Sequence, residues 1–307
     1  MKKENSLKSA FLIYFIIVIP LTFFLIPQFK KIKNANEKYQ KKLTTYQNLS
    51  LNNPLPSSST EINCQGDLFF QENSPILALH IFKDNLYFSS LDKKLTAVNI
   101  QNKSKIFQTE GKIFTDFFSN SQELFAADIL ENQIVKINPN NGRTETQSYF
   151  QKIGRISTLT QDEKGNFYAA GCASGNIFKI TIPEKTIFTS DLDQTIDLEI
   201  TNNTLYLARY NSTPSVLALD LNEKKKKIIE ESKNVSNLLK ENGEIFVVYL
   251  ENNQTKLGKI TNDKTEEIQT IPCQFPLKIA IGNKKIFYTS LADYQGRIFT
   301  LSKKASK

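Results

Sequence analysis

Histidine, cysteine, glycine and proline are all scarce in this 307-residue chain, and each shortage narrows what the protein can be. The single histidine, His80, rules out any mechanism that needs two imidazole groups. Three cysteines, Cys64, Cys172 and Cys273, are too few for a disulfide framework. With only 11 glycines, 10 prolines and 40% hydrophobic residues, the chain is neither collagen-like nor disordered by composition.

The positive charge of the chain, +8 overall, is concentrated at one end. Residues 1–50 contain nine lysines and two glutamates, whereas residues 51–307 contain 30 basic and 29 acidic residues. Electrostatic binding to nucleic acid needs basic residues clustered on the folded domain. The sequence therefore predicts no nucleic-acid partner.

Residues 10–27 (AFLIYFIIVIPLTFFLIP) contain no charged residue. As a helix they would reach roughly 27 Å, close to the thickness of a bilayer's hydrocarbon core. The alternative is a cleaved signal peptide, but its apolar region is shorter, about 7–15 residues, and ends at a small-x-small site that is absent here. We predict a short polar tail over residues 1–9 and a single transmembrane anchor over residues 10–28.

Residues 29–60 connect this anchor to the remainder of the chain. The polar stretch 29–50 has hydrophobic residues at helix-like intervals, which predicts a short helical stalk that could self-associate. NNPLPSSST (52–60) has the composition of a linker. A folded domain is therefore expected over residues 61–307.

Two arguments favour opposite orientations of the anchor in the membrane. Three lysines precede the apolar segment and six follow it closely, which by the positive-inside rule would place the C-terminal side in the cytoplasm. However, a long folded domain can cross a membrane largely regardless of charge, and a short tail with three lysines is a poor candidate for export. We predict a single-pass membrane protein whose folded domain is extracytoplasmic.

A short strand-like run recurs six times in this domain, at intervals of 38 to 43 residues. Its copies are NLYFSS (85–90), ELFAAD (123–128), NFYAAG (166–171), TLYLAR (204–209), EIFVVY (244–249) and KIFYTS (285–290). Each copy has an aromatic residue at the same position. A second run follows after a turn, with apolar residues at its second and fifth positions: KLTAV (94–98), QIVKI (133–137), NIFKI (176–180), SVLAL (215–219), KLGKI (256–260) and RIFTL (297–301).

These repeats predict an all-β fold, a six-bladed β-propeller. A repeat of about 40 residues accommodates four short strands with their turns. Middle strands that lack polar alternation are typical of a sheet covered on both faces, as a blade is. The stretches just before each first run, such as ILALHIF (76–82) and PLKIAIG (276–282), would be the inner strands.

A third run, which would be the outer strand of a blade, precedes each first run by eighteen residues: LFF (68–70), IFQ (106–108), YFQ (149–151), IFT (187–189), KII (227–229) and IQT (268–270). The last repeat has none after it, whereas residues 61–71 supply one before the first. A closed ring needs every blade complete. We therefore predict that residues 66–71 pair antiparallel with residues 296–301 and bury Leu68, Phe69 and Phe70.

The strings ELFAADILENQIVKINPNNGRTE (123–145) and GNFYAAGCASGNIFKI (165–180) resemble six-bladed propellers of the NHL-repeat and gluconolactonase-like superfamily. Enzymes similar to gluconolactonases hold a divalent metal with Glu, Asn and Asp, the Glu from a Glu-Gly-Pro motif on the first inner strand. That strand is ILALHIF here, so no position inherits a metal ligand from the resemblance. Propeller lyases use a catalytic histidine with a metal, and arylesterase-like members use paired histidines, which this chain does not have.

We therefore predict a membrane-tethered protein-binding, ligand-binding or scaffold module, without cofactor or metal and not an enzyme, whose partner is a protein or small ligand of unknown identity. A lactonase-type propeller hydrolase is the alternative. In a propeller the starts of the inner strands and the ends of the second strands meet at one channel mouth. The candidate binding residues placed there are Asp128, Arg155, Asp193, Arg209, Tyr210, Tyr249 and Tyr294. Tyrosine and arginine are frequent in binding hot spots.

Three residues also have structural interpretations. The Asp128 carboxylate is expected to cap backbone N–H groups of its turn, and His80 to line the core or the channel with its hydrogen bond satisfied. Cys64 and Cys273 precede the outer and the inner strand of one blade, and successive strands run in opposite directions. The register therefore predicts that they lie on opposite faces and form no disulfide.

Overall fold

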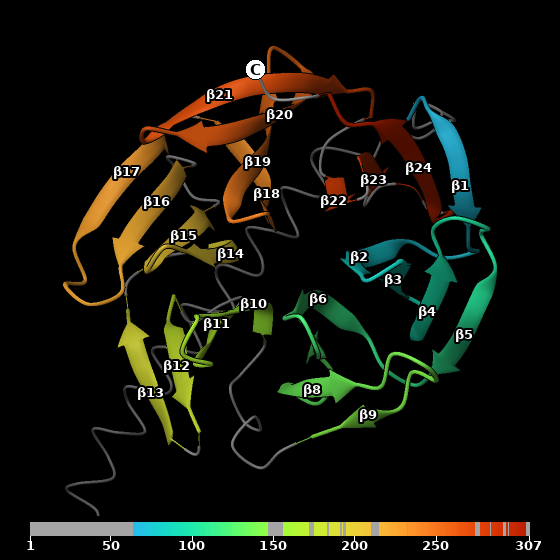
Figure 1. The fold of residues 1–307 in the computed structure, drawn as a ribbon, viewed down its shortest axis with the longest axis horizontal. Coiled ribbons are helices and arrows are strands. Elements are labelled where there is room, and N and C mark those ends of the chain that lie inside the picture. Colours follow the sequence, from blue (N-terminus) through green and yellow to red (C-terminus); the bar gives the residue numbers. More distant parts are fainter. Residues whose placement is uncertain are drawn as a thin grey trace, which may run out of the picture. The chain divides into compact units, whose positions relative to one another are not determined.

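The computed structural model describes residues 64–146, 156–171, 175–182, 184–190, 192, 195–209, 215–231, 233–273, 277–282, 284–290, 293 and 295–304. These residues form 24 strands in six four-stranded antiparallel sheets, which stand around a common centre as a six-bladed β-propeller (Figure 1). Nowhere in this part of the chain is there a helix long and apolar enough to cross a membrane. The predicted anchor (residues 10–28) and stalk lie outside the described residues.

Five blades are each built from consecutive strands, from the channel outward. Blade 1 contains β2 (Ile76–Phe82), β3 (Asn85–Ser90), β4 (Lys94–Asn99) and β5 (Lys105–Glu110). Blade 2 contains β6 (Phe114–Ser119), β7 (Leu124–Asp128), β8 (Gln133–Ile137) and β9 (Thr144–Glu145). Blade 3 contains β10 (Ile156–Gln161), β11 (Phe167–Gly171), β12 (Ile177–Thr181) and β13 (Glu184–Thr189). Blade 4 contains β14 (Thr195–Thr201), β15 (Thr204–Arg209), β16 (Ser215–Asp220) and β17 (Lys226–Glu231). Blade 5 contains β18 (Asn234–Glu241), β19 (Glu244–Glu251), β20 (Gln254–Thr261) and β21 (Lys264–Ile271).

The first and second predicted runs are the second and third strands of every blade, as the repeat pattern requires. Five of the six predicted outer strands are also present, while the sixth, at 149–151, lies outside the described residues. The aromatic residue that recurs in the first run is packed between blades, because a blade has a neighbour on each face. Its six copies are Tyr87, Phe125, Tyr168, Tyr206, Phe246 and Phe287, of which all but the half-buried Tyr206 are buried.

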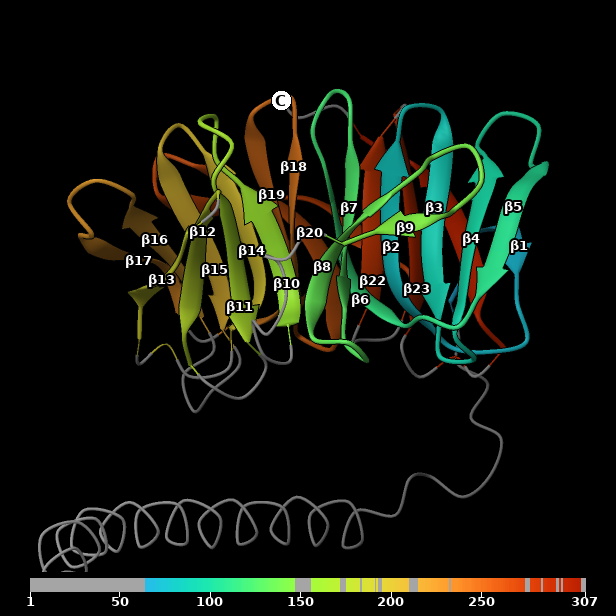
Figure 2. The same cartoon turned by 90° about the horizontal axis from the view of Figure 1, so that it is seen from below.

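Blade 6 closes the ring with strands from both ends of the domain. It contains β22 (Leu277–Gly282), β23 (Lys285–Ser290), β24 (Arg297–Ser302) and, outermost, β1 (Asp67–Gln71). β1 pairs antiparallel with β24, with Asp67 opposite Thr300 and Gln71 opposite Arg297, which confirms the predicted closure. Figure 2 shows β1 at the same level as the strands of blade 1, beside β4 and β5.

The side chains of β1 are not all buried as predicted. Phe69 is 4% exposed and packs edge-on against Phe287, and Phe70 is half-buried against Phe88 of blade 1. Leu68, however, is 48% exposed. An outermost strand has one face that no neighbouring strand covers, so alternate side chains point to solvent.

Several hairpins turn through asparagines with left-handed backbone, which suits a chain with few glycines. Asn202 and Asn203 have φ of 48° and 58°, and Asn252 and Asn253 have φ of 50° and 59°. Two successive residues with positive φ make a type I′ turn, whose twist matches that of the flanking strands.

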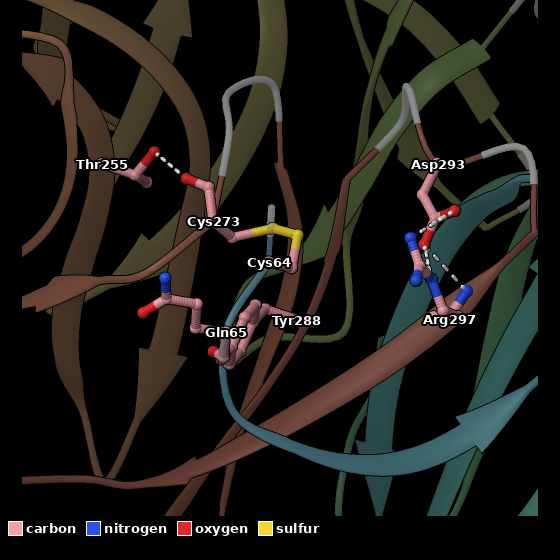
Figure 3. The surroundings of a disulfide bond; sticks show 7 residues. All are labelled: Cys64, Gln65, Thr255, Cys273, Tyr288, Asp293 and Arg297. Atoms are coloured by element: carbon pink, nitrogen blue, oxygen red, sulfur yellow. Dashed lines mark hydrogen bonds and ion pairs between the residues drawn. A yellow bond between two sulfur atoms is a disulfide. The ribbon is translucent and has the colours of Figure 1, made fainter. Parts of the chain in front are cut away.

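The prediction that Cys64 and Cys273 stay apart is wrong, because the two residues form a disulfide with their Cα atoms 3.9 Å apart (Figure 3). The chain does not extend straight back from β1. It turns at Gly66, whose φ of +147° side chains rarely adopt, and the amide of Gln65 donates to the carbonyl of Pro272 at 2.7 Å. The Tyr288 hydroxyl donates to the carbonyl of Gln65 and fixes this turn. Cys172 lies outside the described residues.

Candidate functional site

The inner strands of blades 1 to 5 each carry a β-bulge within two residues of their start, seen as a shift of pairing register. A bulge bends a strand and re-aims the side chains that follow it. The residues after the bulges, with the equivalent residue of blade 6, form a ring of six positions that we call the belt. In blade order the belt is Ala78, Asp116, Thr158, Asp197, Asn237 and Lys278.

Belt side chains of blades 2, 3 and 4 each join their blade to the next. Asp116 Oδ2 accepts the backbone N–H of Leu159 in blade 3 at 2.9 Å, and Asp197 Oδ2 accepts that of Leu238 in blade 5 at 2.7 Å. Between them, Thr158 Oγ1 accepts the N–H of Leu198 at 3.2 Å. The inner strands lie at the channel edge of each sheet, so some of their backbone N–H groups have no neighbouring strand to pair with. The belt side chains accept these N–H groups instead.

The belt holds a proton between two carboxyl groups. Thr158 Oγ1 lies 2.7 Å from Asp116 Oδ2 and 2.9 Å from Asp197 Oδ1. A hydroxyl has one proton to donate, so the second contact requires a protonated carboxyl as donor. Burial first, and then the charge of Asp197, raise the pKa of Asp116 to about 7, while the ammonium of Lys278 opposes this shift. Burial raises the pKa of Asp197 as well, so both carboxyl groups of the pair take up a proton more readily than an exposed aspartate does.

A cavity of about 410 Å³ lies next to the belt, toward the ends of the inner strands. Part of its wall is apolar, formed by residues such as Leu79, Ile81, Phe117, Phe118, Leu239 and Ile279. The polar part includes His80, Ser119, Asn120, Asp162, Glu199 and Lys240. It reaches the turns that follow β10 and β18, where Glu163 and Gly243 are exposed.

His80 lines this cavity with its imidazole satisfied, as predicted. Its Nε2 is 2.8 Å from Ser119 Oγ of the next blade. Burial lowers the pKa of His80 to about 4, so the ring is neutral at physiological pH. A neutral imidazole adds no charge to the cavity, and its role here is to join blades 1 and 2.

Glu199 is the carboxyl at the centre of the cavity's polar wall. It lies two residues beyond Asp197 on β14, and no lysine or arginine among the described residues comes within ion-pair distance of it. Burial and then the charges of Asp197 and Asp116 raise the pKa of Glu199 well above its ordinary value, although Lys240 and Thr160 oppose the shift. Its half-buried side chain is accessible from the cavity while protein surrounds it on the other sides.

The described residues of the predicted binding set lie at the opposite mouth, where the inner strands begin. Asp128 is fully buried and caps its turn, accepting the N–H groups of Leu130 and Glu131, which confirms the capping role. Its other oxygen accepts the Lys112 ammonium at 2.6 Å. The structural interpretation of Asp128 therefore accounts for both oxygens.

Of the remaining predicted binding residues, the structure describes Tyr249 and Arg209. Tyr249 is 1% exposed inside blade 5, which differs from the surface position expected, because its strand is covered on both faces. Arg209 donates from Nη2 to Ser215 Oγ at 2.8 Å across its own hairpin. Arg155, Asp193, Tyr210 and Tyr294 lie outside the described residues.

The sequence contained a signal for the belt and the cavity. Asp116, Asp197 and Glu199 stand inside apolar runs (FTDFF and TIDLEI), and a buried polar residue is more informative than an exposed one. Only their register across the ring, set by the bulges, shows that they converge. Bulge positions depend on pairing between strands and could not be read from spacing along the chain.

The donor set does not fit the divalent metal that the resemblance implies for the enzymes. Among the described residues, no three His, Cys, Asp or Glu side chains lie close enough together to hold a metal. The two belt carboxylates that do converge already accept backbone N–H groups and neighbour the Lys278 ammonium.

Comparison with known proteins places the chain by fold alone. No family model matches it, and no curated protein matches its sequence. A gluconolactonase of Xanthomonas campestris, XC5397, is similar over 77% of this chain and 89% of its own, with 8% identity and a TM-score of 0.61. A chain of a nidogen/laminin complex is similar over 72% of this chain and 99% of its own, with 13% identity and a TM-score of 0.54. A streptogramin B lyase is similar over 80% of this chain and 88% of its own, with 14% identity and a TM-score of 0.51. The fold is therefore a propeller whose neighbours include gluconolactonase-like members with varied functions.

Proposed function

We propose that this chain is a membrane-tethered binding module, a propeller that takes its ligand in the channel cavity. The observation that carries the proposal is the cavity itself. Its volume of about 410 Å³ falls within the range of roughly 300–1,000 Å³ that is usual for small-molecule sites. Its wall combines apolar side chains with a few convergent polar groups, which is the composition of such sites.

The belt beneath the cavity supports a binding role because it makes the floor rigid. Its hydrogen bonds run from blade 2 to blade 6, where Asn237 Nδ2, in the amide orientation that satisfies its neighbours, donates to the carbonyl of Leu277 at 2.6 Å. A floor fixed before the ligand arrives loses little conformational entropy on binding.

The Cys64–Cys273 disulfide supports an extracytoplasmic position for the propeller. Disulfides persist in oxidising compartments and are rare in a reducing cytosol. The uncharged run over residues 10–27 supports attachment through a membrane anchor. On intact cells or spheroplasts, we expect an added protease to degrade the propeller from outside. A propeller that is protected until the membrane is lysed would reverse this topology.

A lactonase-type hydrolase remains the second candidate, because Asp116 and Asp197 converge on Thr158 at the channel centre. The hydrogen bonds that occupy their oxygens give both carboxylates a structural role instead. Metal-dependent hydrolysis of aldonolactones by the purified protein, lost on chelation and in Asp197→Asn, would establish the enzyme.

Filling the cavity tests the binding proposal. We would screen a small-molecule library by thermal shift against the full-length protein in detergent and against Leu239→Trp, which places an indole in the cavity. A ligand of the folded state raises the melting temperature according to its concentration and affinity. We expect hits that stabilise the unmodified protein and lose this effect in Leu239→Trp.

The matched control is Ile182→Trp, which adds the same side chain on an exposed turn after β12, where Ile182 is 55% exposed. It should respond to the hits as the unmodified protein does. Hits that stabilise all three proteins equally, or the absence of any hit, would contradict binding in the channel.

A further inference from the structure

We propose that the channel cavity recognises an organic cation, with a primary ammonium or guanidinium group at Glu199 and the attached carbon chain against the apolar wall. This inference rests on the proposed function and adds the chemical class of the ligand. The group could belong to a free amine or to a lysine or arginine side chain of a peptide.

The first argument is the balance of charge around Glu199. Asp197 on the same strand and Asp116 from blade 2 face it from the belt, and both act to raise its pKa. Lys240 from blade 5 opposes them, but its side chain is exposed at the cavity rim. Lys278 from blade 6 lies close enough to Asp116 and Asp197 to lower the pKa of each, and His80 from blade 1 is neutral. A cation beside Glu199 would favour its ionised form, which burial and the two aspartates disfavour, whereas an anion would disfavour that form further.

The second argument is that Glu199 is the carboxyl left free for a ligand. Two other carboxyl residues line the cavity, and Glu163 is exposed at its rim. Asp162 accepts the N–H groups of Lys164 and Asn166 and the side chain of Asn166, so its own turn occupies it. Thr160 lies beside Glu199 and opposes the rise in its pKa, but Thr160 is buried and is not part of the cavity wall. Glu199 does line the cavity and has no ion-pair partner among the described residues, so an ammonium group in the cavity could pair with it.

The third argument concerns the shape of the ligand. Phe118 is opposite the recurring aromatic of its blade, as Glu199 is, so the two lie at the same level of the channel. An aromatic face is a favourable neighbour for a cation, and Leu239 at this level offers an apolar surface. A cation that carries an apolar body therefore matches both parts of the wall.

Binding a cation would ionise Glu199, so binding should release a proton. The pKa of Glu199 is raised in the free protein, and a bound ammonium group lowers it. Affinity should consequently increase as the pH rises from about 5 to about 8, where an alkylammonium ligand keeps its charge. An uncharged ligand of the same shape should show no such dependence.

Isothermal titration calorimetry on the full-length protein in detergent tests this with three probes of matched shape: 2-phenylethylamine, 3-phenylpropanamide and 3-phenylpropanoate. We expect the amine to bind most tightly, to release protons in buffers of different ionisation heat, and to lose at least about tenfold in affinity in Glu199→Gln. Such a loss corresponds to removing one charged hydrogen bond. Nα-acetyl-lysinamide and Nα-acetyl-argininamide distinguish the two sources, since a peptide side-chain site prefers them to the free amine.

The matched control is Glu163→Gln, which removes an exposed carboxylate at the cavity rim and should change affinity less than about twofold, as expected for a screened surface charge. Glu199→Gln keeps the shape of a protonated glutamate, and its unchanged melting temperature verifies that it folds.

Equal affinity of the amine for Glu199→Gln and for the unmodified protein, or an equal loss of affinity in Glu163→Gln, would overturn the cation proposal. If the amide or the propanoate binds instead and Leu239→Trp abolishes it, the cation proposal fails while the binding function stands. If no probe binds and the library gives no hit, both fail.

Discussion

The seams between blades 2, 3, 4 and 5 are held from the channel, whereas the seam between blades 6 and 1 is held from the rim. At the seams between blades 2 and 3, 3 and 4, and 4 and 5, a belt side chain accepts a backbone N–H from the next blade. These side chains are Asp116, Thr158 and Asp197. At the closing seam the belt positions are Lys278 and Ala78, neither of which can accept a hydrogen bond. There β1 and the Cys64–Cys273 disulfide hold blade 6 instead (Figures 1 and 3).

This difference follows from chain connectivity. Blades 1 to 5 are each continuous, and the chain itself links every one to the next, so side-chain hydrogen bonds need only align them. Blade 6 joins residues more than 220 positions apart, such as Gln71 and Arg297, and the entropy of bringing them together must be offset by strand pairing, burial and a covalent bond. The closing seam should therefore be the most sensitive to mutation.

Phe69→Ala should have the largest effect among changes to the closing seam. Phe69 is 4% exposed, between blade 6 and blade 1, where it contacts Phe287 with ring centroids 4.9 Å apart. Truncating a fully buried phenylalanine typically costs about 3–5 kcal/mol. Chemical denaturation of the full-length protein would measure the loss of stability.

Leu68→Ala is the control for this prediction, because the neighbouring residue on the same strand is 48% exposed. It should change the free energy of unfolding by less than about 1 kcal/mol. Equal effects of the two substitutions would mean that β1 is held by its backbone pairing alone.

Removing the disulfide should have the next largest effect. It links residues 209 positions apart, and in the chain-entropy description so long a loop restricts the unfolded chain strongly, for a typical contribution of about 2–4 kcal/mol. The double substitution Cys64→Ser with Cys273→Ser should lower the melting temperature. Dithiothreitol should lower that of the unmodified protein by a similar amount and leave the double variant unchanged. A reductant effect of equal size on both proteins would show that another thiol is responsible.

The fold could be predicted from the sequence further than the site could. Repeating residues such as Tyr87 and Phe246 face the same packing environment in each blade, so the period along the chain reports the architecture directly. The closure followed from a missing outer strand after residue 302. The disulfide was missed because one residue, Gly66, reverses the chain, and extrapolating a strand cannot account for that.

The predicted binding residues and the cavity lie at opposite mouths of the channel, and the cavity was not predicted for a related reason. Exposure was expected of Tyr249 because tyrosine is frequent in binding surfaces, but its strand is buried. Glu199 was overlooked because it stands in an apolar run, TIDLEI, and convergence across six blades is visible only once the ring is closed. A polar residue within an otherwise buried strand would have been the better indication.

Within the belt, Asp197→Ala should lower the free energy of unfolding, by less than the loss of the β1 contacts does. It removes the acceptor of the buried N–H of Leu238, and it leaves the N–H of Leu198 with Thr158 Oγ1 as its acceptor. Leaving a buried donor unsatisfied costs about 1–3 kcal/mol. Asp263→Ala serves as the control, since Asp263 is an exposed partner of Lys227 and such pairs contribute about 0–1 kcal/mol. Equal losses would indicate that water replaces the belt's hydrogen bonds without cost.

Asp116→Asn should have the smallest effect, and its sign should depend on pH. The raised pKa of Asp116 means that the folded state keeps a proton that the unfolded chain releases above roughly pH 4. The contribution to stability is therefore fully present below that pH and is lost as the pH rises to about 7, with a slope of at most about 1.4 kcal/mol per pH unit. Asparagine does not titrate, and its amide oxygen in the place of Oδ2 can accept both the N–H of Leu159 and the hydroxyl of Thr158.

We therefore expect Asp116→Asn to match the unmodified protein in melting temperature near pH 4 and to exceed it by a growing margin up to about pH 7. Asp197 and Glu199 also have raised pKa values, and the charge of Asp116 contributes to that of Glu199, so the difference between the two melting curves reports position 116 together with its effect on these neighbours. A margin that stays constant with pH would show that Asp116 is ionised throughout and that the shared proton lies on Asp197. In that case Asp197→Asn would show the pH dependence instead.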